Sequence, residues 1–172
     1  WTVLIPQSSI PTGTTDVDIE VHATDAVGNT DVVTRTLSID TEVDPFSVEA
    51  NQTANDVINQ DELNAGFALQ GTVEPGSEVI VTIRGVAKTA TVDAAGNWSA
   101  EFSGSDLPAG EYSATATIVA TDPAGNTSTL TESFEVDTVF EAPVLDSVTY
   151  EIGSQDVSEI SVEGIAGTGE SI

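Results

Sequence analysis

The chain repeats itself with a period of 97 residues. Residues 23–30 read Ala-Thr-Asp-Ala-Val-Gly-Asn-Thr, and residues 120–127 read Ala-Thr-Asp-Pro-Ala-Gly-Asn-Thr. The register between the two copies holds without a gap when residues 1–41 are placed on residues 98–138. A period of this length is close to one small domain and is longer than most solenoid or propeller-blade repeats. The sequence therefore predicts an array of similar domains.

Alternating apolar and polar residues predict short β-strands within the repeat. In 67–73 and 98–102 every second side chain is apolar or small, as in a half-buried strand, and a longer strand is expected at 112–121. Aspartate followed three residues later by glycine marks tight turns at 93–96 and 122–125. Turns are also expected at 74–77 and 85–87, and the second of these leads into a strand at 89–92. Seven short strands and no helix of consequence predict an all-β fold, an immunoglobulin-like antiparallel β-sandwich.

The register also predicts how the chain divides into domains. Residues 45–138 should form one complete sandwich, and residues 1–44 should supply the last three strands of a preceding repeat. Residues 139–172 should form a linker and the first two strands of a following repeat. Trp1 and Trp98 occupy equivalent positions on the apolar face of a strand, so both are expected in a core.

Composition excludes several classes of function. The formal net charge is −26, from 29 acidic and three basic residues, and a field of that sign repels nucleic acid and anionic lipid. No apolar stretch approaches the ~18 residues of a membrane span, so direct membrane insertion is not expected. With His22 as the only histidine and no cysteine, the sequence supports neither a Ser-His-Asp nor a Cys-His site. We therefore expect a protein that is not an enzyme.

The same charge points to a hard cation bound by oxygen, and so to calcium. Stacked domains should bring the carboxylates at the exit of one repeat against the turn carboxylates of the next. The turn aspartates also stabilise their turns without a metal, and the acidic residues of the polar loop can cap a helical turn near residues 60–64. The candidate ligands lie at the exits, in the turns and in that loop: Asp40, Asp44, Asp137, Asp25, Asp93, Asp122, Asp61 and Glu62.

Several phrases of the sequence resemble one family of repeats. Asp56–Glu62, Gly71–Ser77, Val92–Trp98, Ala120–Thr127 and Val136–Thr138 are similar, in this order and spacing, to the bacterial immunoglobulin-like domains of giant surface adhesins. These are the biofilm-associated and repeats-in-toxin adhesins exported by type I secretion. The resemblance implies an extracellular stalk module on the bacterial cell surface, which supports adhesion and biofilm formation. It also implies neighbouring repeats of the same polypeptide as partners and calcium that rigidifies their junctions.

Three alternatives remain open at this point. A carbohydrate- or receptor-binding module on the same fold would need a cluster of exposed aromatic residues. An acidic, salt-adapted domain would be stabilised by monovalent salt as well as by calcium. The partial repeats at the two ends could also complete one another between molecules. The linker Thr138–Pro143 is bulkier than is usual in such repeats.

Overall fold

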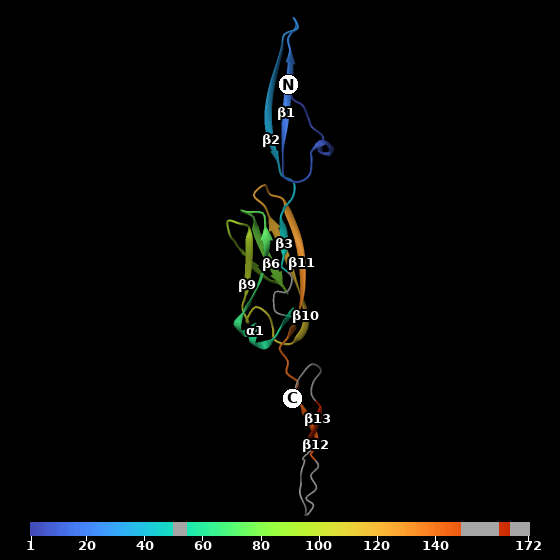
Figure 1. Ribbon diagram of the computed structural model, residues 1–172, viewed down its shortest axis with the longest axis vertical. Coiled ribbons are helices and arrows are strands. Elements are labelled where there is room, and N and C mark those ends of the chain that lie inside the picture. Colours follow the sequence, from blue (N-terminus) through green and yellow to red (C-terminus); the bar gives the residue numbers. More distant parts are fainter. Residues whose placement is uncertain (50–54, 149–161, 166–172) are drawn as a thin grey trace, which may run out of the picture.

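The structure is a computed structural model that describes residues 1–49, 55–148 and 162–165. Three parts follow one another along its long axis (Figure 1). A hairpin of β1 (Thr15–Thr24) and β2 (Thr30–Ile39) lies at one end, preceded by a 3-10 turn, η1 (Gln7–Ser9). A pair of strands, β12 (Val144–Val148) and β13 (Val162–Ile165), lies at the other end. The middle part is a two-sheet sandwich.

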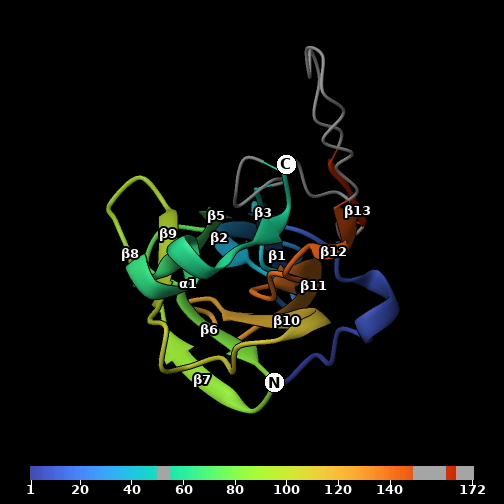
Figure 2. The same ribbon diagram turned by 90° about the horizontal axis from the view of Figure 1, so that it is seen from below.

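The sandwich packs a five-stranded sheet against a four-stranded one. The first sheet has the order β4-β11-β10-β6-β7 and the second β3-β5-β9-β8, and β10 and β6 lie across the core from β5 and β9 (Figure 2). All pairs are antiparallel except β4–β11, which is parallel. The elements of the sandwich are β3 (Phe46–Val48), β4 (Val57–Ile58), α1 (Gln60–Ala65), β5 (Phe67–Val73), β6 (Glu78–Ile83), β7 (Val86–Thr89), β8 (Thr91–Val92), β9 (Asn97–Phe102), β10 (Glu111–Thr121) and β11 (Thr127–Asp137). This is the predicted immunoglobulin-like β-sandwich.

Trp98 stands at the centre of the core. Its side chain is 1% exposed, and its indole Nε1 donates to the Ser47 carbonyl at 3.0 Å, which joins β9 to β3 across β5. Gly71 makes this approach possible, because a Cβ there would lie 2.1 Å from the Ser47 carbonyl oxygen. Most of the rest of the core is formed by alternate residues of the two facing sheets, as the apolar pattern predicts, and Val43, Leu63, Ala90 and Leu107 contribute from outside the strands.

Two features of the sandwich differ from the sequence prediction. The turn expected around Gly85–Ala87 is instead a two-residue turn at Arg84 and Gly85, whose φ angles are 48° and 87°. Both angles are positive, as the tightest hairpin turns require. The strand expected at 89–92 is divided, since β7 pairs with β6 and β8 pairs with β9 of the other sheet. The two-residue strand β4 was not predicted, because so short a segment carries no periodicity.

The N-terminal segment forms two strands where three were predicted. Residues 1–6 adopt no strand, and Trp1 is 93% exposed although it is the counterpart of the buried Trp98. The prediction of a core position for Trp1 is therefore wrong in this structure. The physical reason is that Trp98 is covered by β5 and β3, and the described residues place no equivalent strands beside Trp1. The described residues contain no helix with the length and hydrophobicity needed to cross a membrane.

The two equivalent tryptophans provide a matched test of this packing. We expect Trp98→Ala to lower the free energy of unfolding of the sandwich by about 3–5 kcal/mol, because it removes a large buried side chain. Trp1→Ala should change it by less than about 0.5 kcal/mol. Urea unfolding of the full chain, followed by circular dichroism, measures both values. Equal effects of the two substitutions would contradict the assignment of Trp98, and not Trp1, to the core.

Candidate metal centre

Three tight turns share one hydrogen-bonded geometry. Each starts with an aspartate whose Oδ1 accepts the backbone N–H of the asparagine four residues later, at 2.8–2.9 Å. The side-chain amide of the same asparagine donates to Oδ2 at 2.6–2.8 Å, and the glycine between them has a φ of 86–95°. The three pairs are Asp25 with Asn29, Asp93 with Asn97, and Asp122 with Asn126. The turn role predicted for these aspartates is therefore observed.

The hydrogen bonds also control the ionisation of these aspartates. In Asp25 and Asp93, the side-chain and backbone donors of the paired asparagine lower the carboxyl pKa. Burial of Asp122 raises its pKa, but the hydrogen bonds from Asn126, Gly125 and Ala124 together outweigh this effect and lower the pKa of this carboxyl as well. All three carboxylates are therefore charged at neutral pH.

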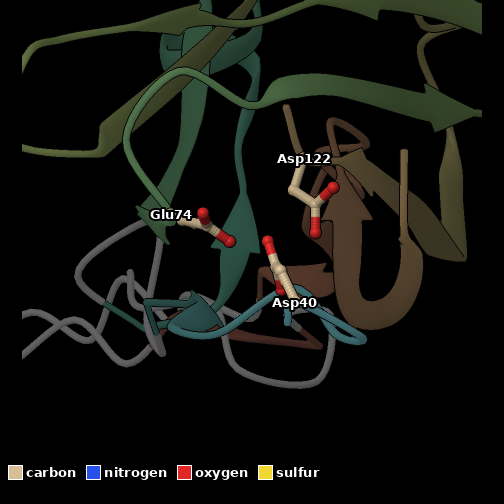
Figure 3. Close-up of side chains that lie close together, drawn as sticks. All are labelled: Asp40, Glu74 and Asp122. Atoms are coloured by element: carbon tan, nitrogen blue, oxygen red, sulfur yellow. The ribbon is translucent and has the colours of Figure 1, made fainter. Parts of the chain in front are cut away.

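One of the three turns lies in an acidic cluster. Asp122, Asp40 and Glu74 each place a carboxylate oxygen within 4.8 Å of those of the other two (Figure 3). Asp40 directly follows β2, Glu74 directly follows β5, and Asp122 directly follows β10. The cluster thus joins the N-terminal hairpin to both sheets of the sandwich. Asp122 is 5% exposed, and the other two residues are partly buried.

No basic side chain neutralises this cluster. Arg35 lies on β2 opposite Ile19, and the guanidinium of Arg84 stacks 4.6 Å from the ring centroid of Tyr112. Lys88, the last of the three basic residues in the sequence, pairs with Asp106 at 2.9 Å. The donors at the cluster are neutral: the Asn126 side-chain amide lies 2.8 Å from Asp122 Oδ2 and 3.3 Å from Asp40 Oδ1, and the Thr14 hydroxyl lies 3.3 Å from Asp40 Oδ1.

The electrostatic repulsion within the cluster is most evident at Glu74. Burial raises the pKa of its carboxyl, and repulsion from Asp40, Asp122 and Asp44 raises it further, against a hydrogen bond from the Asp44 backbone. Its Oε2 is buried and has no hydrogen-bond partner. A buried carboxylate oxygen that faces other carboxylates and has no donor needs a cation or a proton.

This donor set is chemically suited to calcium. All three side chains offer hard carboxylate oxygens, and Ca²⁺ takes six to eight oxygens at about 2.3–2.6 Å. The three carboxylates would supply part of that shell, and water or turn carbonyls would supply the rest. The donor set contains no nitrogen or sulfur ligand, which disfavours zinc and the softer transition metals.

The other predicted ligands lie elsewhere or have other roles. Asp44 is close enough to repel Glu74 but is not among the three clustered residues. Asp25 lies at the tip of the β1–β2 hairpin, at the end opposite Asp40, and Asp93 lies in the β8–β9 turn. Asp137 Oδ1 accepts the Val139 N–H at 3.1 Å at the exit of the sandwich.

Asp61 and Glu62 belong to a capping box at the start of α1. The Asn59 side chain accepts the backbone N–H groups of Asp61 and Glu62 at 2.9 and 3.0 Å, and Glu62 accepts the Asn59 N–H at 3.1 Å. This local role was one of the two that the sequence left open. Glu74 was not predicted as a ligand, although the turn that contains it was expected at this end of the sandwich.

A shallow cavity of about 490 Å³ lies beside Lys88 and Asp106, lined in part by Phe67 and Phe102. Asp106 already accepts the Ser103 N–H at 2.7 Å, the Ser103 hydroxyl at 2.8 Å and Lys88 at 2.9 Å. These donors lower its pKa to about 2. The Lys88–Asp106 ion pair therefore connects β7 to the loop after β9, and the Asp106 carboxylate already has hydrogen-bond donors without a ligand.

The aromatic and histidine side chains do not form a second site. Trp1 and Phe140 are exposed, but Trp1 precedes the sandwich in the sequence and Phe140 follows it. They therefore do not form the cluster that a carbohydrate-binding face would need. His22 is solvent-exposed and lies 3.3 Å from Glu20 on the same strand. These statements concern the residues that the structure describes.

The raised pKa of Glu74 predicts a pH dependence of the cation-free protein. Because the folded state holds this proton more tightly than the unfolded state, stability should fall as pH rises from about 4.5 through the folded pKa. Glu74→Gln should abolish that loss and raise the melting temperature at neutral pH. Thermal melts in a chelator across this pH range measure the effect. Glu78→Gln, at an exposed glutamate outside the cluster, is the control for net charge, and an equal gain there would contradict the prediction.

Comparison with known proteins places this fold in a family. The family model for the bacterial Ig-like domain matches residues 48–138. A structure of a 1.5-MDa bacterial ice-binding adhesin is 34% identical over 72% of this chain and 42% of its own, with a TM-score of 0.42. A Ca²⁺-stabilised adhesin of an Antarctic bacterium is 32% identical over 88% of this chain and 40% of its own, with a TM-score of 0.44.

A bacterial immunoglobulin-like domain of the M. primoryensis ice-binding adhesin is 38% identical, over 56% of this chain and 97% of its own, with a TM-score of 0.40. The chain thus spans about two-fifths of the first two structures. At TM-scores below 0.5 these superpositions add nothing to the description of the fold. No curated protein matches the sequence. On the family match, which covers more than half of its residues, the chain belongs to the bacterial Ig-like domain family.

Proposed function

We propose that this chain is an extender segment of a large bacterial surface adhesin, which is rigidified by calcium at the junctions between its repeats. Residues 1–44 and 139–172 then belong to the repeats on either side of the sandwich at 45–138. The segment acts mechanically and not as an enzyme. It lies outside the cell and supports adhesion and biofilm formation. The observation that carries the proposal is the meeting of Asp40, Glu74 and Asp122 at one junction without a basic partner.

The arrangement of the sandwich suits a stalk. Its chain enters at β3, beside the N-terminal hairpin, and leaves after β11 at the opposite end (Figure 1). Each added repeat of this kind increases the length of the array instead of its width. Membership of the bacterial Ig-like family and the phrases shared with adhesin repeats support the same function.

Calcium at the junction has two expected effects. It offsets the repulsion among Asp40, Glu74 and Asp122, and it connects the end of β2 to the turns after β5 and β10. Binding to the folded state alone stabilises that state by about 2.7 kcal/mol when calcium exceeds its dissociation constant a hundredfold. At the low calcium concentration of the cytosol the chain would remain loose for export, and outside the cell it would stiffen.

The turn aspartates supply a matched pair of variants for the test. Asp122→Asn and Asp93→Asn make the same change in their turns, because an NH₂ group replaces the Oδ2 that accepts the asparagine amide while Oδ1 can still accept. Asp122 belongs to the acidic cluster and Asp93 does not. We expect calcium to raise the melting temperature of the wild type and of Asp93→Asn on the order of 10 °C, and that of Asp122→Asn by much less. Small-angle scattering should show a longer, stiffer particle with calcium for the first two proteins only.

Two results would count against the proposal. A melting temperature that sodium chloride of equal ionic strength raises as much as calcium does would favour an acidic domain without a specific metal. An equal loss of the calcium response in Asp93→Asn and Asp122→Asn would place the effect in the turns and not at the junction.

A further inference from the structure

Two buried oxygens of one turn lack a hydrogen-bond partner. Among the described residues, Glu74 Oε2 and Ser77 Oγ are the buried side-chain oxygens in this position. The two residues begin and end a single turn, in which the Ser77 N–H donates to the Glu74 carbonyl at 3.1 Å. Ser77 is 6% exposed, so its hydroxyl is largely shielded from solvent. An unpaired buried hydroxyl costs free energy, and its presence calls for an explanation.

The strand register brings this hydroxyl to the acidic cluster. β6 and β10 are antiparallel neighbours, with Val79 opposite Ala120, and both of these side chains are fully buried in the core. The same register continued by two residues sets Ser77 opposite Asp122. Because residues two apart on a strand share a face, both side chains point inward, as their burial shows. Residues directly opposite one another on one face have Cβ atoms about 4.5–5.5 Å apart.

The next copy of this turn carries a ligand type at the same position. Residues 160–172 match residues 67–79 without a gap, and both copies keep the glycine just before the position of Ser77. In the later copy a glycine replaces Glu74, and Glu170 replaces Ser77. The turn thus keeps one carboxylate and moves it from its first residue to its last. Residues 166–172 lie outside the described part of the structure, and this likeness is one of sequence.

We propose that the Ser77 hydroxyl is a ligand of the cation bound by the acidic cluster. The inference rests on the proposed calcium junction and adds a neutral oxygen to its three carboxylates. Calcium takes six to eight oxygen ligands, so the carboxylates leave room for a hydroxyl. One bound cation would account for both unpaired oxygens of the turn, Glu74 Oε2 and Ser77 Oγ.

The two ends of the turn then control the affinity of a junction. Calcium affinity depends on the number and charge of the ligands. A glutamate at the position of Glu74 or at that of Ser77 supplies the charge, and a hydroxyl at the other end supplies a further oxygen. Repeats that differ at these two positions would form junctions of different calcium affinity along one array.

Removal of the hydroxyl should act differently with and without calcium. In a chelator, Ser77→Ala should not lower the melting temperature, because it removes a buried hydroxyl that has no partner. In calcium chloride, the dissociation constant of the cluster should rise on the order of tenfold. Isothermal titration calorimetry and thermal melts of the full chain measure the two effects. Ser113→Ala, at an exposed serine of β10, is the matched control and should alter neither.

A structural role of Ser77 gives the opposite pattern. If the hydroxyl only supports the turn, Ser77→Ala lowers the melting temperature in the chelator and binds calcium as the wild type does. That result would overturn the proposal.

Moving the carboxylate along the turn is the sharper test. Glu74→Gln should weaken calcium binding, because it removes a charged ligand. Addition of Ser77→Glu should restore much of the affinity, since it places the carboxylate where the later copy has it. Addition of Ser113→Glu returns the same charge outside the cluster and should restore none. Equal recovery by the two double variants would make the effect one of net charge and reject the ligand role.

The titrations separate failure of this inference from failure of the proposed function. Asp122→Asn identifies the part of the calcium titration that belongs to the cluster. If that part is unchanged in Ser77→Ala, the Ser77 ligand is rejected and the calcium junction is retained. A wild type without that part of the titration would reject both. If the Ser77→Glu double variant does not fold, as circular dichroism in the chelator shows, the comparison of Ser77→Ala with Ser113→Ala decides.

Discussion

The hydrogen bonds between Asp122 and Asn126 hold together the end of the sandwich on which the junction depends. They close the turn between the two longest strands of the domain, β10 and β11, which pair over their full length. They also fix the Asp122 carboxylate in a single orientation at the surface that meets the N-terminal hairpin. A carboxylate has about four lone-pair sites, and the backbone N–H and side-chain amide of Asn126 meet one site on each oxygen of Asp122. The same group can therefore stabilise its own turn and still face Asp40 and Glu74.

Electrostatic repulsion distinguishes the end of the sandwich that carries Asp122 from the rest of the acidic surface. A chain with a net charge of −26 places like charges close together in many positions, but most of its carboxylates are exposed and screened by solvent. The junction differs because Asp122 is buried and Glu74 has a buried oxygen without a donor. The single amide of Asn126 cannot neutralise three carboxylates. We therefore expect the free energy of the junction to respond to cations and to pH.

The sequence predicted features that local periodicity or turn chemistry determines. The alternating strands, the three aspartate turns and the meeting of Asp40 with Asp122 all followed from the repeat and from the topology of a sandwich. The position of Trp1 could not be predicted, because burial depends on strands that cover a residue and not on its own pattern. Glu74 was missed for a related reason: a glutamate before Pro75 has no local signature of a ligand, and only the folded arrangement brings it to Asp40.

The β10–β11 hairpin runs from the entry end of the sandwich to its exit end. Its turn lies at the entry end of the domain, where Asp122 meets Asp40, and its open end lies at the exit, where β11 pairs with β4 and the chain continues to Asp137. A cation that ties Asp40 to Asp122 would attach the preceding repeat directly to this hairpin. Tension would then pass from one long hairpin, β1–β2, to the next, and the shorter strands of the second sheet would support the hairpin from the side. In such an array the stiffness of the junction would depend on the β10–β11 hairpin, because Asp122 stands in its turn.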